Sequence, residues 1–322
     1  MTASQRGSVS PEAGAEETPR RPLGAARPRH GEKVVKGFLA LCAALSVGVT
    51  IAIVVSLLTP TIGFFREVSV VEFLTGTQWS PGFARGEFGV LPIVVGTLTV
   101  VVIALLVAIP IGLLSAIYLA EYAPRRVRAV IKPALEVLEG IPTVAIGLFG
   151  LFLLRPLAEQ IFPFMNWRGD FSIGVAGVAV GLLIVPLIAS VSEDAMRSVP
   201  GGLREGAYAL GANKMRVSLR VVFPAAISGI VAAVVLAMSR AIGETMIVLL
   251  VAGAGNPNLS FDLARGAQTM TAYIGGTATG DIATGTTVYN TIFAVGSLLF
   301  LMTLVVNLFA IRLVRRFREV YE

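Results

Sequence analysis

An arginine and a glutamate interrupt an otherwise uncharged stretch, residues 221–261, of this 322-residue chain. Because Glu244 follows Arg240 by one helical turn, the two side chains are expected on the same face of a single membrane-spanning helix. An arginine keeps its proton in apolar surroundings, so its guanidinium must face protein, water or an anion. Its planar fork suits an oxyanion such as phosphate. A pair that only locks two helices is the structural alternative.

Other reactive side chains are scarce, since the chain has one cysteine and one histidine. Cys42 lies in an apolar run and His30 in a Pro- and Arg-rich segment, which excludes a disulfide framework and a Cys/His zinc site. Nucleophilic catalysis lacks an imidazole to activate it. No lysine follows a glycine, so the phosphate-binding loop of an ATPase is absent from the sequence. We therefore expect neither an enzyme nor a bound cofactor.

The composition indicates a membrane protein. Hydrophobic residues make up 55%, charged residues 14%, and the mean hydropathy is +0.80, which leaves too little polar surface for a water-soluble globule. Uncharged runs of suitable length predict six transmembrane helices and an all-α fold. The predicted spans are 37–65, 88–120, 140–154 with 135–139 added, 171–192, 224–250 and 282–311.

The distribution of charge predicts the organisation of the chain. Residues 1–35 are expected to form a disordered cytoplasmic tail, and 36–322 a transmembrane domain with a cytoplasmic segment at about 193–222. Most of the 26 Lys and Arg residues fall in alternate connecting segments, which predicts a multi-pass protein of the bacterial cytoplasmic (inner) membrane with both termini cytoplasmic. A short external helix is expected at 259–274.

The cytoplasmic segment carries a recognisable motif. Glu205, Gly206 and Ala207 are followed by Gly211, then nine residues, then three apolar residues at 221–223 and Pro224. This pattern resembles the EAA signature of binding-protein-dependent ABC importer permeases, with Gly206 in place of an alanine. The resemblance implies a type I (MetI-like) importer fold. It also implies that Glu205, Gly206, Ala207 and Gly211 belong to a coupling helix that docks on an ATPase.

A second resemblance concerns the intramembrane charges. Residues 240–245 read RAIGET, which is similar to the corresponding helix in permeases of the phosphate-specific ABC importer. Further similarity lies in FGVLP at 88–92, in residues 109–124 and in LEGIPT at 138–143, and it covers the chain from about Val34 onward. Of that importer's two homologous permeases, the chain looks more like the PstC type than the PstA type.

The resemblance implies inward transport of inorganic phosphate, with Arg240, Glu244 and Thr245 on the substrate path. Glu244 is expected to neutralise Arg240 when the path is empty, or to accept a proton-bearing oxygen of hydrogen phosphate. The implied partners are a second homologous permease, two ATPase subunits that bind the ATP, an external phosphate-binding protein and membrane lipid. Nucleic acid is not among them, because the net charge of +6 is explained by membrane topology.

Two other functions fit part of this pattern. A permease for sulfate or molybdate would also use an arginine, although RAIGET argues against it. A secondary transporter that needs no ATPase would also place a charged pair in the membrane, but would not require the EAA-like segment.

Overall fold

The computed structural model describes residues 30–83, 86–255 and 259–317. Residues 1–29 of the predicted tail therefore lie outside the described part. The chain divides into two compact units, residues 1–53 and 54–322. What is described of the first unit is the beginning of helix α1 (His30–Glu67), which starts before the predicted end of the tail at residue 35.

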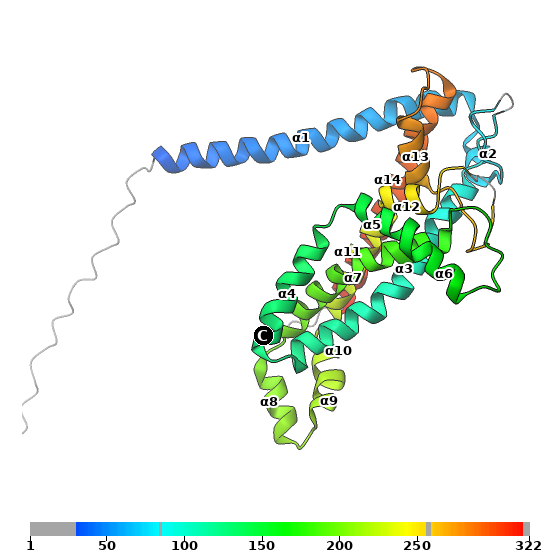
Figure 1. The fold of residues 1–322 in the computed structure, drawn as a ribbon. Coiled ribbons are helices and arrows are strands. Elements are labelled where there is room, and N and C mark those ends of the chain that lie inside the picture. The colour runs from blue at the N-terminus through cyan, green and yellow to red at the C-terminus, as the bar shows by residue number, and fades with distance from the viewer. Residues whose placement is uncertain (1–29, 84–85, 256–258, 318–322) are drawn as a thin grey trace, which may run out of the picture. The chain divides into compact units, whose positions relative to one another are not determined.

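The second unit is a helical bundle (Figure 1). Within the described residues, β-type pairing is limited to one isolated bridge between Trp79 and Phe88. After α1, the elements are α2 (Val70–Thr75), α3 (Leu91–Ile117), π-helical η1 (Tyr118–Tyr122), α4 (Arg125–Glu139), α5 (Thr143–Phe149), π-helical η2 (Gly150–Leu154), α6 (Arg155–Ile161), α7 (Ile173–Arg197), α8 (Gly201–Ala209), α9 (Lys214–Val217), π-helical η3 (Ser218–Val222), α10 (Phe223–Ala225), α11 (Ile227–Ile242), α12 (Met246–Val251), α13 (Met270–Ala278) and α14 (Thr287–Phe317).

The predicted all-α membrane architecture is confirmed. Among the described residues, five helices are long and apolar enough to cross a membrane, and a bent pair brings the number to six if it counts as one span. The five are Glu32–Glu67, Leu91–Tyr122, Thr143–Ile161, Ile173–Arg197 and Thr287–Arg312. The bent pair joins Lys214–Ala225 to Ile227–Ile242 at an angle of 69°.

Two predicted spans have different boundaries. The third was expected to take in residues 135–139, but these end α4, and the span runs from Thr143 to Ile161. Pro142 separates the two helices, because a proline disfavours helical backbone at the residue before it, here Ile141. The fifth span was expected to continue to residue 250, whereas α11 ends at Ile242.

The external helix predicted at 259–274 is also misplaced. The structure has α13 at Met270–Ala278, and no helix precedes it between 259 and 269. Thr269 is the N-cap of α13, because its Oγ1 accepts a hydrogen bond from the Ala272 N–H at 3.2 Å.

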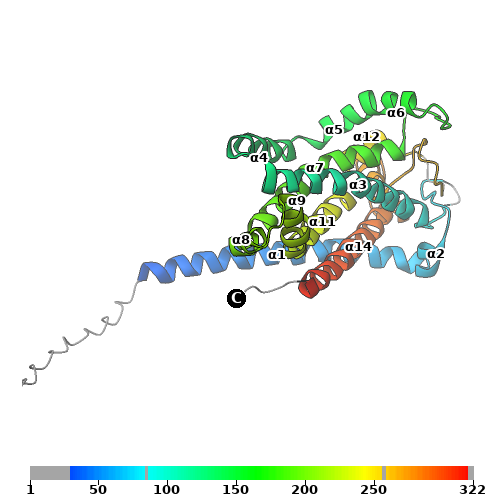
Figure 2. The same ribbon diagram turned by 90° about the horizontal axis from the view of Figure 1, so that it is seen from below.

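Helix α7 is the centre of the bundle, with α3 on one side and the α5–α6 layer on another (Figure 2). Gly177 lets α3 approach closely, because a Cβ at that position would lie 2.6 Å from the Cβ of Ile103. At Gly181 a Cβ would lie 3.0 Å from the Ala104 carbonyl oxygen. These glycines therefore serve helix packing.

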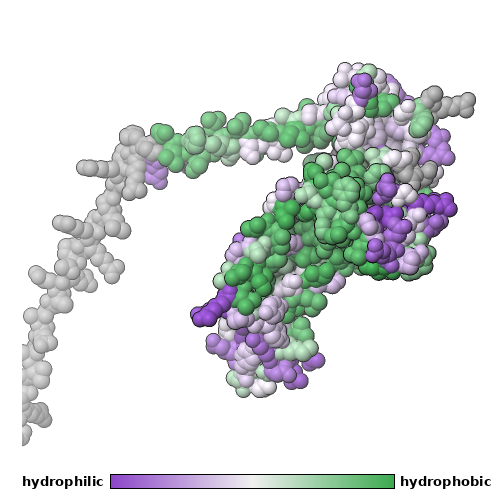
Figure 3. Space-filling view, in the orientation of Figure 1, coloured by the Kyte–Doolittle hydropathy of each residue, from purple (hydrophilic) through white to green (hydrophobic). Residues whose placement is uncertain are grey.

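The surface of the bundle is apolar where a membrane would contact it. Hydrophobic side chains cover the middle of the visible face, and hydrophilic ones gather around α8 and α9 and at the opposite end (Figure 3). Leu106 on α3, Phe152 on η2 and Phe309 on α14 are all largely exposed. Such large exposed side chains suit contact with lipid or with another membrane chain.

Candidate functional site

Arg240 lies in the last turn of α11, and its partner comes from a different helix. Its Nη1 lies 3.2 Å from Oε1 of Glu139, and its Nη2 donates to the Glu139 carbonyl oxygen at 3.3 Å. The Arg240 side chain is 33% exposed, so part of the guanidinium remains accessible. Glu139 was not predicted from the sequence. It is the last residue of α4 and stands directly before the Gly140–Pro142 break, which precedes an apolar span.

The prediction that Glu244 shares a helical face with Arg240 and pairs with it is wrong. Gly243 ends α11, and Glu244 lies in the break before α12. One carboxylate oxygen, Oε1, accepts hydrogen bonds from the N–H groups of Met246 at 3.1 Å and Ile247 at 3.2 Å. The carboxylate therefore satisfies the free donors at the start of α12, which explains why the helix is interrupted here.

The break is held by further contacts. Glu244 is only 8% exposed, and its carbonyl oxygen accepts a hydrogen bond from Oγ1 of Thr271 at 2.7 Å. Thr245 is half-buried, and its hydroxyl donates to the Gly243 carbonyl oxygen at 3.3 Å. Residues 243–245 thus form an ordered turn directly after the helical turn that carries Arg240.

A buried carboxylate fixes the helix that supplies Glu139. Glu193 on α7 has a side chain only 1% exposed, and it contacts Arg128 Nε at 2.8 Å and Lys132 Nζ at 2.9 Å, both on α4. Arg197 lies 3.7 Å away, and Asp194 forms a second ion pair with Lys132. Burial lowers the pKa of Lys132, but hydrogen bonds to Asp194 and Glu193 outweigh it and raise the pKa above 10.5.

The coupling segment predicted from the sequence forms two short helices with a turn between them. Ala207 on α8 is half-buried and packs against an apolar cluster that includes Val217. Gly211 has a φ of +80°, the left-handed region that favours glycine. Glu205 and Gly206 are exposed, and a Cβ at Gly206 would meet no atom within 4 Å, so the alanine of the EAA signature fits there.

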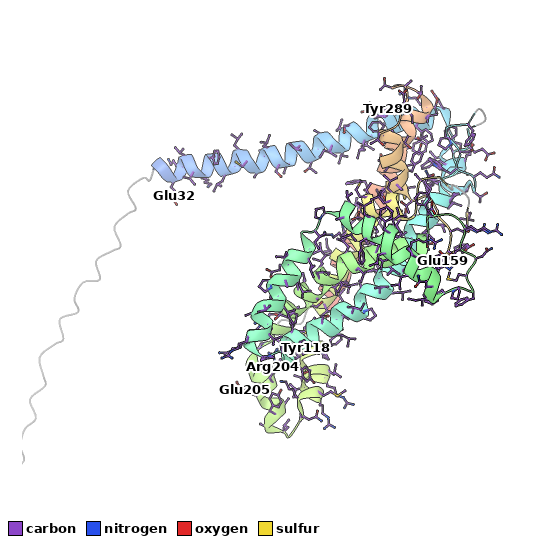
Figure 4. The ribbon with its side chains drawn as sticks, in the orientation of Figure 1. Glu32, Tyr118, Glu159, Arg204, Glu205 and Tyr289 are labelled. Atoms are coloured by element: carbon purple, nitrogen blue, oxygen red, sulfur yellow. The ribbon has the colours of Figure 1, made fainter. Side chains whose placement is uncertain are left out.

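Arg204 fastens this segment to the bundle and was not singled out from the sequence. Its guanidinium donates to the carbonyl oxygens of Met196 and Val199, both at 2.7 Å, and pairs with Glu121 of η1 at 3.0 Å. Figure 4 shows Arg204 and Glu205 at the same end of the bundle as Tyr118, which begins η1. These contacts tie α8 to η1 and to the end of α7 and the residues that follow it.

Comparisons with known proteins identify the family of the chain. Residues 108–319 match the family described as "Binding-protein-dependent transport system inner membrane component". The probable ABC transporter permease protein YqgH of Bacillus subtilis is 35% identical over 81% of this chain and 84% of its own length. The phosphate transport system permease protein PstC 1 of Mycobacterium tuberculosis is 35% identical over 76% of this chain and 82% of its own.

Among solved structures, a chain of a bacterial ABC transporter involved in the import of alginate aligns with a TM-score of 0.60. The alignment covers 89% of this chain and 99% of the other at 19% identity, which establishes the shared fold. These relatives are named as transporters and permeases, in agreement with the prediction of a transporter subunit rather than an enzyme. The chain belongs to the family of binding-protein-dependent transport system inner membrane components, where it is similar to PstC permeases.

Proposed function

We propose that this chain is the PstC-like permease subunit of an ATP-driven importer that moves inorganic phosphate into the cytoplasm. The observation that carries the proposal is the state of Arg240, which is partly exposed and held by a carboxylate from another helix. A carboxylate and a phosphate offer the same acceptor geometry to a guanidinium. Phosphate can therefore take the place of Glu139 without leaving the cation uncompensated.

This exchange gives transport a release step as well as a binding step. The Glu139 carboxylate neutralises Arg240 when the path is empty, which is the role that was expected of Glu244 from the sequence. When phosphate binds, Glu139 becomes a nearby negative charge that weakens the hold on the anion. Multi-step conduction needs binding that is favourable enough to enter and weak enough to leave.

Glu244 and Thr245 contribute to the same path in different ways. Glu244 acts as a positioning residue, because its bonds to the Met246 and Ile247 N–H groups set the break that follows Arg240. The Thr245 hydroxyl donates to a carbonyl oxygen at 3.3 Å, a long contact that it can exchange for a phosphate oxygen.

Energy for transport comes from separate chains. We assign docking on an ATPase to α8 and the turn that follows it, through Glu205, Gly206, Ala207 and Gly211. Next to them, Leu210 is 91% exposed and offers an apolar contact. The complete importer pairs this chain with a second homologous permease, two ATPase subunits that bind the ATP, and an external phosphate-binding protein. Both termini are cytoplasmic, so that α8 faces the ATPases.

Phosphate uptake into cells that depend on this importer tests the proposal. We expect Arg240→Gln to reduce uptake of labelled phosphate at least about 100-fold, and Arg240→Lys to keep a measurable fraction, because only the first removes the charge. Unlabelled sulfate should leave wild-type uptake unchanged. Normal uptake in Arg240→Gln would contradict the role of Arg240, and competition by sulfate as strong as by phosphate would contradict the substrate.

A further inference from the structure

A second cluster of cationic side chains surrounds a cavity away from Arg240. The cavity has a volume of about 390 Å³ and lies where the end of η1, the first part of α4 and the end of α7 meet. This is the end of the bundle that carries α8, because Arg204 of α8 bonds Glu121 of η1. Its lining residues are Leu119, Ala120, Ala123, Arg125, Arg128, Ala129, Lys132, Pro133, Glu136 and Arg197.

Two of the cations are held in place and two are free to take a ligand. The buried Glu193 carboxylate fixes Arg128 through Nε and Lys132 through Nζ. Arg197 has one ion contact, at 3.7 Å, and Arg125 is exposed with no ion pair to any residue that the structure describes.

The charges around the cavity do not cancel. Four cations line it, and the carboxylates on or behind its wall are Glu136, Glu193 and Asp194, which leaves one net positive charge. The remaining wall consists of small or apolar side chains, so that nothing bulky blocks access to the guanidinium groups. Convergent arginines and a lysine at the end of a transmembrane bundle suit the phosphate group of an anion or of a lipid headgroup.

We propose that the cavity between η1, α4 and α7 is a binding site for a phosphate group, with Arg125 and Arg197 as the main ligands and Arg128 and Lys132 as the fixed base. Two sources offer this chemistry, free inorganic phosphate and the headgroup of an anionic phospholipid. The inference does not rest on phosphate being the transported substrate. A ligand seated here joins α4 to α7 and so stabilises the helix that ends at Glu139.

The test compares the complete importer carrying Arg125→Gln and Arg197→Gln with wild type. Both side chains are exposed, and the double variant keeps the contacts of Glu193 with Arg128 and Lys132 while it removes the 3.7 Å contact with Arg197. The matched control is Arg126→Gln with Arg312→Gln, which removes the same charge from exposed arginines that do not line the cavity. In one arm, native mass spectrometry follows binding of phosphatidylglycerol, with phosphatidylcholine as the neutral reference. In the other, equilibrium dialysis measures binding of labelled inorganic phosphate.

In at least one arm, we expect the apparent affinity to fall roughly tenfold in the double variant and to stay within about twofold of wild type in the control. Loss confined to phosphatidylglycerol assigns the site to a lipid headgroup, and loss confined to inorganic phosphate assigns it to the free anion. If all three proteins bound both ligands equally, or if the control lost as much as the double variant, the proposal would be overturned.

Discussion

Arg155 and Arg240 are both bonded to a glutamate, but their surroundings differ. Arg155, the first residue of α6, has a side chain only 9% exposed. It pairs with Glu159 at 3.0 Å, donates to the Gly169 carbonyl oxygen at 2.9 Å and stacks over the Trp167 ring at 4.4 Å. Arg240 is more exposed, and both its contacts are to one residue at longer distances.

The difference separates a structural arginine from one that can exchange its partner. Several short contacts from one region fix Arg155, and an incoming anion would have to break them together. Among the described residues, Glu139 alone bonds the Arg240 side chain, and an oxyanion can replace its carboxylate directly. Whether an intramembrane arginine can bind an anion is therefore better judged from the partners of its N–H donors than from its position in the span.

The largest expected effect distinguishes the two arginines by uptake and stability. Arg240→Gln should abolish uptake with little change in Tm. Arg155→Gln should lower Tm by about 5 °C, because the stacking and hydrogen bonds are lost, while uptake per folded molecule stays within about threefold. Purified protein in detergent gives Tm, and uptake is normalised to the amount of chain in the membrane. Uptake lost equally in both variants at unchanged Tm would remove the distinction.

Glu193→Gln should destabilise the bundle by about 3 kcal/mol, because it removes the charge of a buried carboxylate that neutralises the half-buried Arg128 and Lys132 side chains on α4. Asp194→Asn is the matched control, since this exposed carboxylate contacts Lys132 alone and should cost less than about 0.5 kcal/mol. Denaturant unfolding of the purified chain measures both. Equal effects of the two variants would mean that the buried position of Glu193 is unimportant.

A smaller effect is expected from Glu139→Gln, which keeps a hydrogen-bond acceptor and removes the charge that neutralises Arg240. Loss of this ion pair destabilises the phosphate-free importer relative to the conformation that hydrolyses ATP. ATP hydrolysis in the absence of phosphate should therefore rise about threefold. The assay uses the complete importer in vesicles, and Glu72→Gln, which removes the charge of an exposed glutamate on α2, is the control. Unchanged hydrolysis in Glu139→Gln would show that the contact does not hold the empty state.

The smallest effect concerns pH. The pKa of Lys132 is raised in the folded protein, so its ion pairs contribute fully below pH 10.5 and lose their contribution as pH rises through the raised value. Between pH 9 and 12, the wild type should therefore lose more stability than Lys132→Gln, by less than about 1 kcal/mol. Thermal unfolding across this range measures the difference, and parallel curves for the two proteins would contradict it.

Local sequence features predicted much of the fold. Uncharged runs located the spans because a membrane helix must be apolar where it crosses the hydrocarbon, as in the predicted span 171–192, most of which lies in α7 (Ile173–Arg197). The motif predicted a coupling helix that includes Gly211, whereas α8 ends at Ala209, and the φ of +80° at Gly211 explains why a glycine stands there.

The sequence did not reveal the partner of Arg240. Glu139 and Arg240 are 101 residues apart, and only the packing of α4 brings them together. Helical spacing favoured Glu244 because it assumed an unbroken helix, whereas Gly243 and the capping carboxylate interrupt it. Short polar breaks inside apolar runs are where tertiary contacts override periodicity.

The exchange of Glu139 for phosphate on Arg240 is tested most directly by a structure of the complete importer with phosphate trapped in its membrane path. The account predicts a phosphate oxygen within about 3 Å of the Arg240 guanidinium, and the Glu139 carboxylate withdrawn from it. An intact Arg240–Glu139 pair beside a phosphate bound elsewhere in the path would contradict it.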